Sequence, residues 1–525
     1  MDEERSIIDR NILRLEESIR ALKSRRNELS PISRLPTEIL CNIFKFSLTD
    51  YPIPQSWTSF SQVSRQWRSS SLSAPELWTN INLSYPRWTQ KMLIRSKRAK
   101  LTIRSGYSLA ESEPKTIEIV RLCLYEMSRV EEINLSEIRE LLALEKIFRD
   151  LPKSAPQLHT LCIRLFSGAA GFSIDEDFLY GTERLRSVEL INCKISWDSR
   201  LLTGLTCLTL KDSLKANSSI IQLLNAFRRM PALSYLLLDD SIPDDSGGPS
   251  TYDVVDLPFL QELNISSGVG ALTTFLRHIS FPHSTILDLI CKENQSSTEI
   301  DFSKILPILA SKFLSSLVIR SLRVGYPDDI DEPEGLEFYL WTTALIPSLP
   351  IPESPLHLVF TWFSSHPRDY INALTCAFDT MSLSFLTQLR ISIPIDSLAL
   401  IKTFGKLPLL ERVYLEGFSS QGFSSHTFFE ALVYKSEEAE KSKTAYRNVS
   451  FPKLRYIHLV GGFIENETTI DRLLDCLMER YERNAEVEAI CLEDCYSTFS
   501  SNEVERIKEV VVDVIWDGRV HNWWG

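Results

Sequence analysis

The chain has 525 residues, of which 44% are hydrophobic and 24% charged, so it has enough length and apolar content for several domains with large cores. No apolar run reaches the roughly 18 residues that a membrane-spanning helix needs, and the charged, amphipathic N-terminus does not resemble a secretory signal. The formal net charge of −12 is uneven, because residues 1–100 carry 17 Lys and Arg against 10 Asp and Glu, whereas the remainder carries 40 against 59. This acidic body argues against broad binding of nucleic acid.

The ten cysteines are scattered along the chain, and none forms a C-x-x-C pair. Cys491 and Cys495 are the closest two. Such a pattern is typical of free thiols in a reducing compartment, so we expect a cytoplasmic or nuclear protein without a disulfide framework. It predicts no zinc site, no other metal site and no cofactor, and nothing predicts contact with a membrane.

Residues 2–29 are predicted to form a helix with apolar residues at heptad spacing. Arg26 fills the one seam position that is not apolar, and two interpretations stay open. The helix could self-associate as a short coiled coil through residues 2–29, or it could fold back on the domain that follows. A basic-zipper interpretation fails, because the basic residues lie within the heptads and not ahead of them. The apolar seam consists of Ile8, Ile12, Leu15, Ile19, Leu22 and Leu29.

A second helix is predicted from Leu35-Pro36 onwards, since proline fits the first turn of a helix and Glu38 suits its N-terminus. An apolar stripe follows the 3.6-residue period. Pro52 and Pro54 mark a loop, after which another helix is expected to place three residues on one face, before the run Pro75-Glu76-Leu77-Trp78. The stripe is Ile39, Leu40, Ile43 and Phe44, and the second face is Phe60, Val63 and Trp67.

Three motifs follow one another in residues 31–83: L-P-x-E-I-L-x-x-I-F, V-S-x-x-W and L-W. In this order they resemble the F-box. Residues 26–36, which lead into the first motif, are similar to the same region of many fungal F-box proteins. The resemblance implies a small all-α domain that binds a Skp-family adaptor and, through it, the cullin of a ubiquitin ligase. The alternative is a plain helical hairpin whose stripe is all core. By this resemblance the residues that face the adaptor or support that interface are Leu35, Pro36, Ile39, Leu40, Ile43, Phe44, Val63 and Trp67.

Residues 84–98 are predicted to form a connecting helix, and from residue 99 to 525 a short unit recurs about every 30 residues. Each unit ends in two apolar residues separated by one variable residue, and several begin with Pro-x-Leu. The pattern resembles an irregular leucine-rich repeat, which implies a solenoid of alternating short strands and helices. The alternative is an α/β domain with longer crossovers. The predicted strand pairs are Leu101/Ile103, Ile133/Leu135, Leu161/Ile163, Val188/Leu190, Leu208/Leu210, Leu236/Leu238, Leu263/Ile265, Leu287/Leu289, Leu317/Ile319, Leu358/Phe360, Leu389/Ile391, Val413/Leu415, Ile457/Leu459 and Ile490/Leu492.

Helical faces are predicted within several units and at the C-terminal end, where large aromatics should cap the last strand. Acidic or polar insertions at residues 239–252, 326–337 and 435–448 are expected to be exposed. The helical faces are Ile220, Leu223, Leu224 and Phe227; Ile470, Leu473, Leu474, Leu477 and Tyr481; and Val504, Ile507, Val510, Val511, Val514 and Ile515. The capping aromatics are Trp516, Trp523 and Trp524.

The sequence contains no phosphate-binding glycine motif, no H-E-x-x-H and no G-x-S-x-G, and its eight histidines are dispersed. We therefore expect a binding protein and not an enzyme. The resemblance implies a substrate-recognition subunit of a cullin–RING ubiquitin ligase, in which the F-box binds the adaptor and the repeats bind a target protein. The alternative is a protein-interaction scaffold that acts outside a ligase. The sequence does not indicate the target.

Overall fold

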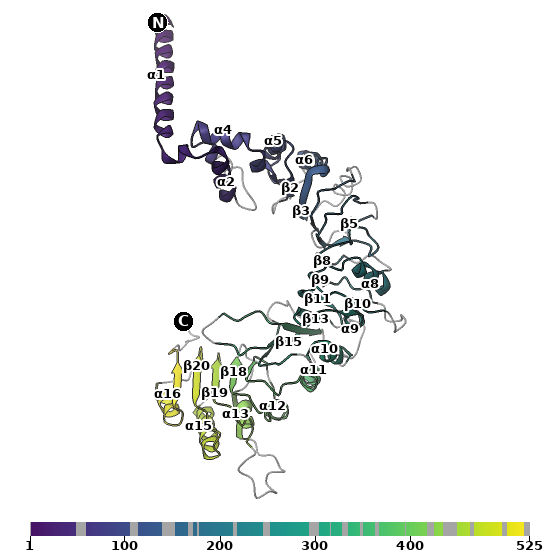
Figure 1. Ribbon diagram of the computed structural model, residues 1–525. Helices are drawn as coiled ribbons and strands as arrows, with labels where there is room; N and C mark the ends of the chain where they lie inside the picture. The colour runs from purple at the N-terminus through teal and green to yellow at the C-terminus, as the bar shows by residue number, and fades with distance from the viewer. Residues whose placement is uncertain are drawn as a thin grey trace. The chain divides into compact units, whose positions relative to one another are not determined.

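The computed structural model describes the following residues: 2–48, 59–105, 114–138, 153–165, 172–175, 178–213, 218–244, 253–292, 304–314, 317–327, 334–346, 350–362, 367–393, 395–416, 425–433, 449–461, 467–495 and 501–518 (Figure 1). The chain divides into two compact units, Met1–Leu233 and Ser234–Gly525. The fold class predicted from the sequence is confirmed, since an all-α N-terminal region is followed by a solenoid-like α/β array.

The first unit begins with helices. Pro36 directly precedes the first residue of α2, and Glu38 lies in the first turn, where the positive end of the helix dipole stabilises a carboxylate. Both residues therefore act at the start of this helix, as predicted. The helical elements are α1 (Asp2–Glu28), η1 (Pro31–Arg34), α2 (Thr37–Ser47), α4 (Arg65–Ser73), η2 (Pro75–Trp78) and α5 (Pro86–Ser96).

The helix predicted after the Pro52–Pro54 loop is shorter than expected, and the prediction that Phe60, Val63 and Trp67 share one helical face is wrong. The chain turns at residues 62–64, and α4 begins at Arg65. Ser64 caps this helix, because its hydroxyl accepts a hydrogen bond from the backbone N–H of Trp67 at 3.2 Å. Val63 consequently lies before the helix and is 54% exposed.

Six strands of the first unit pair in parallel, each with the next along the chain. They are β1 (Asn80–Asn82), β2 (Leu101–Arg104), β3 (Val130–Ile138), β4 (Thr160–Leu165), β6 (Ser187–Ile191) and β8 (Cys207–Lys211). Their inward residues form a continuous buried row of Ile81, Ile103, Ile133, Leu161, Val188 and Leu208. The remaining elements are α6 (Pro114–Leu124), η3 (Met127–Arg129), β5 (Phe172–Ser173), β7 (Cys193–Lys194) and α8 (Ile220–Arg228), which begins with the capping box of Ser219 and Gln222.

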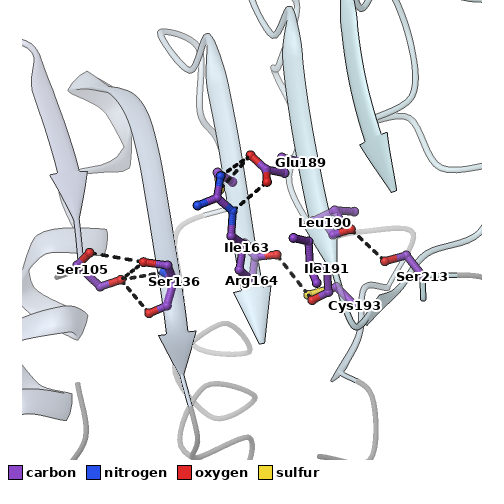
Figure 2. A network of polar contacts seen from close by, with 10 residues as sticks. Ser105, Ser136, Ile163, Arg164, Glu189, Leu190, Ile191, Cys193 and Ser213 are labelled. Atoms are coloured by element: carbon purple, nitrogen blue, oxygen red, sulfur yellow. Dashed lines mark hydrogen bonds and ion pairs between the residues drawn. The ribbon is translucent and has the colours of Figure 1, made fainter. Parts of the chain in front are cut away.

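A recurrent turn ends several strands and holds neighbouring strands together. Asn192 and Asp212 follow β6 and β8 with positive φ angles of 57° and 48°, a conformation that Asn and Asp adopt more readily than most residues. The next residue then bonds back to the strands: the Ser213 hydroxyl donates to the Leu190 carbonyl at 2.9 Å, and the Cys193 thiol donates to the Ile163 carbonyl at 3.6 Å (Figure 2). These side-chain hydrogen bonds hold each turn against the strands that precede it.

Among the residues that the structure describes, the second unit contributes eleven strands to one sheet, and the inward residues of all but the last strand are again continuous and buried. The strands are β9 (Tyr235–Asp239), β11 (Glu262–Gly268), β13 (Ile286–Lys292), β14 (Ser321–Gly325), β15 (Glu334–Trp341), β16 (Leu356–Trp362), β17 (Gln388–Ile391), β18 (Arg412–Glu416), β19 (Tyr456–Val460), β20 (Ala489–Glu493) and β21 (Asp513–Trp516). The other elements are β10 (Val255–Asp256), α9 (Val269–Arg277), β12 (Ile279–Ser280), α10 (Leu306–Lys312), α11 (Pro367–Thr380), α12 (Ser397–Phe404), α13 (Ser425–Val433), α15 (Glu467–Glu482) and α16 (Ser501–Lys508).

A three-stranded meander interrupts the parallel order of this sheet. The strands after β13 lie in the order β16, β15, β14, β17, and β15 is antiparallel to both of its neighbours. The prediction that Leu317 and Ile319 form a strand pair is wrong, since the strand begins at Ser321 and its inward residues are Leu322 and Val324. All the other predicted strand pairs lie on strands.

The prediction of an apolar helix face that extends to Ile515 is also wrong. α16 ends at Lys508, and residues 513–516 form β21, parallel to β20. Val510, Val511 and Val512 are β-branched, which disfavours continuing the helix and favours a strand. β21 covers the edge of β20, with Val514 opposite Ile490 and Trp516 opposite Leu492, so Trp516 does lie against the last predicted strand. Trp523 and Trp524 lie outside the described residues.

Candidate functional site

α2 has two apolar faces, and one of them forms the core of the helical region. Leu40 and Phe44 are one turn apart and are buried to 0% and 1% exposure. The Phe44 ring stacks on Phe60 with centroids 4.7 Å apart and contacts Trp67 at 5.0 Å. Leu40, Phe44 and Trp67 therefore hold the domain together, as apolar residues at this spacing do.

The other face of α2 remains open to solvent. Ile39 is 46% exposed, Ile43 is 39% exposed and Phe46 is 91% exposed. These three residues follow the spacing i, i+4 and i+7, so they form one stripe along the helix, and the exposed Pro36 continues it at the N-terminal end. We call Ile39, Ile43 and Phe46 the α2 stripe. An apolar stripe left exposed on a short helix is typical of a surface that another protein covers.

Of the residues predicted from the sequence, Pro36, Ile39, Ile43 and Val63 are exposed, Leu35 and Trp67 are half-buried, and Leu40 and Phe44 are buried. Phe46 was missed, although it is the most exposed residue of the stripe. Its spacing of seven residues from Ile39 could have identified it. The assignment of these residues to an adaptor interface stays a prediction.

Trp78 fixes the helical region to the first strands. It is 1% exposed, and its indole N–H donates to the Ser71 carbonyl at 2.8 Å. The Arg95 guanidinium of α5 lies over the Trp78 ring at 4.4 Å, a favourable cation–π distance. β1 follows Trp78 almost directly and pairs with β2, so the helical region and the array share a continuous structure.

Residues 32–84 match the family model described as F-box-like. The exposed α2 stripe thus lies in an F-box-like region, whose role is interaction with other proteins. No curated protein matches the chain. Among solved structures, the chain is similar to one titled "Crystal structure of TLR13-ssRNA13 complex", with a TM-score of 0.29 and 11% identity over 74% of this chain. The match covers 43% of that chain, less than half of its length.

α1, which precedes the F-box-like region, exposes its whole heptad seam. Ile12 is 48% exposed and Leu22 is 71% exposed, with the other seam residues between these values. The interpretation that this helix folds back on the following domain therefore finds no support in the burial of its apolar side chains. The seam remains available for another helix.

In the second unit, the face of the sheet opposite the buried leucines carries a row of polar and aromatic side chains. Register pairs join them strand by strand, so all of them point to the same side of the sheet. This face row runs from β13 to β20 as Asp288, His357, Tyr339, Arg323, Arg390, Tyr414, His458 and Cys491.

His357 occupies the acidic end of the face row. Its ring nitrogens lie 2.8 Å from Asp288 and 2.8 Å from Glu337, and the Tyr339 ring stacks on it at 4.2 Å. Burial alone would disfavour the charged imidazolium, but the hydrogen bonds and charges of the two carboxylates outweigh it and raise the pKa of His357 to about 9. His357 is therefore charged at neutral pH, and it forms ion pairs with both carboxylates.

Arginine and tyrosine side chains alternate over the central strands. The guanidinium groups of Arg323, Arg390 and Arg412 lie over the rings of Tyr339, Tyr414 and Tyr456 at 5.8, 4.4 and 5.4 Å. Arg323 and Arg390 also share an ion-pair partner, because Glu416 lies 3.8 Å from Arg323 and 3.6 Å from Arg390. Two guanidinium groups thus lie beside one carboxylate on this part of the sheet.

His458 follows Tyr414 in the face row and precedes Cys491. Burial lowers the pKa of His458, although Glu493 at 3.1 Å opposes this effect. Among the residues that the structure describes, no group of three His, Cys, Asp or Glu side chains could hold a metal ion. Within the same ranges, no helix is both long and apolar enough to span a membrane.

Proposed function

We propose that the chain is a substrate-recognition subunit of a cullin–RING ubiquitin ligase, of the fungal F-box type, and that it is not itself an enzyme. The F-box-like region binds a Skp-family adaptor, which connects it to a cullin, and the array of strands binds a target protein. The observation that carries this proposal is the exposed α2 stripe within the matched residues 32–84. A stripe of this kind loses unfavourable contact with water when an apolar partner covers it.

The test is reconstitution of the full chain with a Skp-family adaptor and a cullin, followed by size-exclusion chromatography. We expect a complex that contains all three proteins. Binding of the adaptor without the cullin would favour the alternative of a scaffold that acts outside a ligase. Absence of both from the complex, with the chain folded, would reject the proposal.

We also propose that α1 pairs with α1 of a second copy of the chain. Its seam has isoleucine at Ile12 and Ile19 and leucine at Leu15 and Leu22, the arrangement of alternating a and d positions in a coiled coil. The seam side chains are about half or more exposed in the single chain, so pairing would bury apolar surface that is otherwise in water.

Replacing Leu15 by aspartate is expected to abolish self-association, because an unpaired carboxylate would have to be buried in the seam. Sedimentation velocity of the full chain measures this directly. The control is Leu13→Asp, which adds the same charge to an exposed leucine outside the seam and should leave the dimer intact. A wild-type chain that sediments as a monomer at high concentration would contradict the pairing.

A further inference from the structure

The charges of α1 are divided between its two halves. Residues 2–17 hold six Asp and Glu against three Arg, a net charge of −3, whereas residues 18–29 hold four Lys and Arg against one Glu, a net charge of +3. Acidic residues in the first turn and basic residues in the last turn stabilise a single helix, but this effect is confined to the end turns. Glu16, Glu17 and Arg20 lie far from both ends, so the division extends along the whole helix and bears on how a second α1 can lie against the first.

A parallel pair would bring like halves and equal seam positions together. Arg26 would face Arg26 of the second copy in the seam, where two like charges repel each other. At the edge of the seam, Glu4 would approach Asp9 of the second copy, because edge positions five residues apart meet in a parallel coiled coil. The edge charges set the direction of a coiled coil, and here they disfavour the parallel one.

An antiparallel pair centred on residue 17 brings unlike halves together and keeps the middle of the seam apolar. Arg26 then faces Ile8 of the second copy in an outer layer, where its aliphatic stem can pack and its guanidinium can reach solvent. The charged seam residue of each copy thus meets an apolar residue instead of its own counterpart. The facing residues are Ile8 with Arg26, Ile12 with Leu22, and Leu15 with Ile19.

The edges of the seam join opposite charges in an antiparallel pair, since each edge of one helix faces the same edge of the other. Lys23 lies opposite residue 11 of the second copy, between Asp9 and Glu16 on that edge. Arg25, on the other edge, lies opposite residue 9 and five residues from Glu4. The ion pairs that Glu16 and Arg25 form within their own helix are more than half exposed on both partners, and such pairs are weak enough to rearrange.

We propose that two copies of α1 pair antiparallel, with the acidic half of each helix against the basic half of the other. The exposed seam is thus covered by a second copy of this chain in one defined direction. This orientation rests on the proposed pairing of α1 and goes beyond it, since the apolar seam alone allows either direction.

The antiparallel direction separates the two F-box-like regions. α1 ends at Glu28 and η1 begins at Pro31, so the F-box-like region follows the C-terminal end of each helix after two residues. At 1.5 Å per residue, the 27 residues of α1 place the two C-terminal ends roughly 40 Å apart. A parallel pair would place both ends side by side. In the antiparallel pair each α2 stripe can therefore be covered by an adaptor at the same time, and the assembly carries two adaptor sites.

The test reverses the charge of each half separately, and then of both halves together, in the full chain. Lys23→Glu with Arg25→Glu makes the basic half acidic, and Glu4→Lys with Asp9→Lys makes the acidic half basic. Either double variant should weaken self-association by roughly tenfold or more at low salt, because like charges then meet along an antiparallel pair. The fourfold variant should return to within about threefold of the wild type, since unlike halves meet again. Sedimentation equilibrium measures the four dissociation constants.

The matched control is Arg10→Glu with Arg14→Glu, the same change of charge on exposed side chains of α1 that lie away from the seam and its edges. It should change the dissociation constant by less than about threefold. A parallel pair gives another pattern, in which Lys23→Glu with Arg25→Glu does not weaken self-association, and this result would overturn the proposal. A fourfold variant that stays as weak as the double variants would also overturn it, because that pattern reports a weaker single helix and not pairing between copies.

Light scattering of the wild-type chain with a Skp-family adaptor separates this proposal from the proposed function. We expect two chains with two adaptors, because the two sites lie at opposite ends of the pair. One adaptor per pair of chains would contradict this separation. If no adaptor binds but the charge variants behave as expected, the ligase is rejected and the antiparallel pair remains. If the chain binds the adaptor but stays monomeric, the pair is rejected and the ligase remains.

Discussion

Replacing Ile43 by aspartate is expected to reduce binding of a Skp-family adaptor by at least about 100-fold while the chain stays folded. Ile43 lies at the middle of the α2 stripe and is 39% exposed, so the free chain tolerates a polar side chain there. In a complex the carboxylate would be buried against the apolar surface of the partner without a counter-charge, which is costly. Isothermal titration calorimetry of the full chain with the adaptor measures the loss.

The matched control for this experiment is Lys45→Asp. Lys45 is exposed on the same helix and, at 3.6 residues per turn, lies about 160° around it from Ile43. It should therefore keep an affinity within about threefold of the wild type. Leu40→Asp gives a different outcome, because Leu40 is fully buried and the F-box-like region should unfold. If Ile43→Asp binds the adaptor as tightly as Lys45→Asp does, the stripe is not the adaptor interface.

The two faces of α2 show what periodicity can and cannot predict. Apolar residues at Ile39, Leu40, Ile43 and Phe44 correctly indicated a helix. A broad stripe does not reveal which edge meets the core, since that depends on where Phe60 and Trp67 pack. The burial of Leu40 and Phe44, and the exposure of Ile39 and Ile43, required the tertiary structure.

The strands were predictable because each leaves one signal in the sequence, and several leave a second. Alternating apolar residues mark the buried face, and the buried rows of both units confirm them. The turn that ends several strands is a second signal that was not used: Asn192-Cys193, Asp212-Ser213, Asp240-Ser241 and Asp494-Cys495 each combine a positive φ with a side chain able to bond back. Asn or Asp followed by Ser or Cys, two residues after a predicted strand pair, would have marked these strand ends.

The meander of β14, β15 and β16 could not be predicted from the repeating unit of about 30 residues. Its strands run antiparallel, and the order along the sheet is the reverse of the order along the chain. Antiparallel strands need only a short connection, whereas parallel strands need a long crossover, so the 30-residue spacing fails here. The face row also escaped prediction, since Arg323 and Arg390 become neighbours only because the meander folds β14 against β17.

Replacing Arg480 by alanine is expected to destabilise the second unit by about 3–5 kcal/mol, the cost of leaving buried groups without partners and of opening a cavity. Arg480 is 1% exposed on α15. Its guanidinium donates to the Ser450 carbonyl at 2.7 Å, to the Phe451 carbonyl at 2.9 Å and to the Leu432 carbonyl at 3.5 Å. Leu432 lies in the last turn of α13, where the helix dipole favours a positive charge.

The sequence placed Tyr481 on the buried face of α15, but Tyr481 is 70% exposed and Arg480 is buried in its place. Arg480 lies three residues after Leu477 and seven after Leu473, so it does follow the helical period of the core. The prediction favoured Tyr481 because tyrosine is more apolar than arginine. The carbonyls at the end of α13 and before β19 require a donor, and this requirement decides which of the two residues is buried.

Thermal unfolding of the full chain, followed by circular dichroism, measures the effect of Arg480→Ala, and we expect the melting temperature to fall by at least about 5 °C. The control is Arg472→Ala, the same substitution at an exposed position of the same helix, which should shift it by less than about 2 °C. Arg480→Met separates volume from hydrogen bonding. Methionine fills most of the space but donates nothing, so it should recover only part of the loss, because the three carbonyls remain buried without donors. If Arg480→Met is as stable as the wild type, the guanidinium contributes only packing. If Arg480→Ala is as stable as Arg472→Ala, Arg480 does not help to hold α15 against the array.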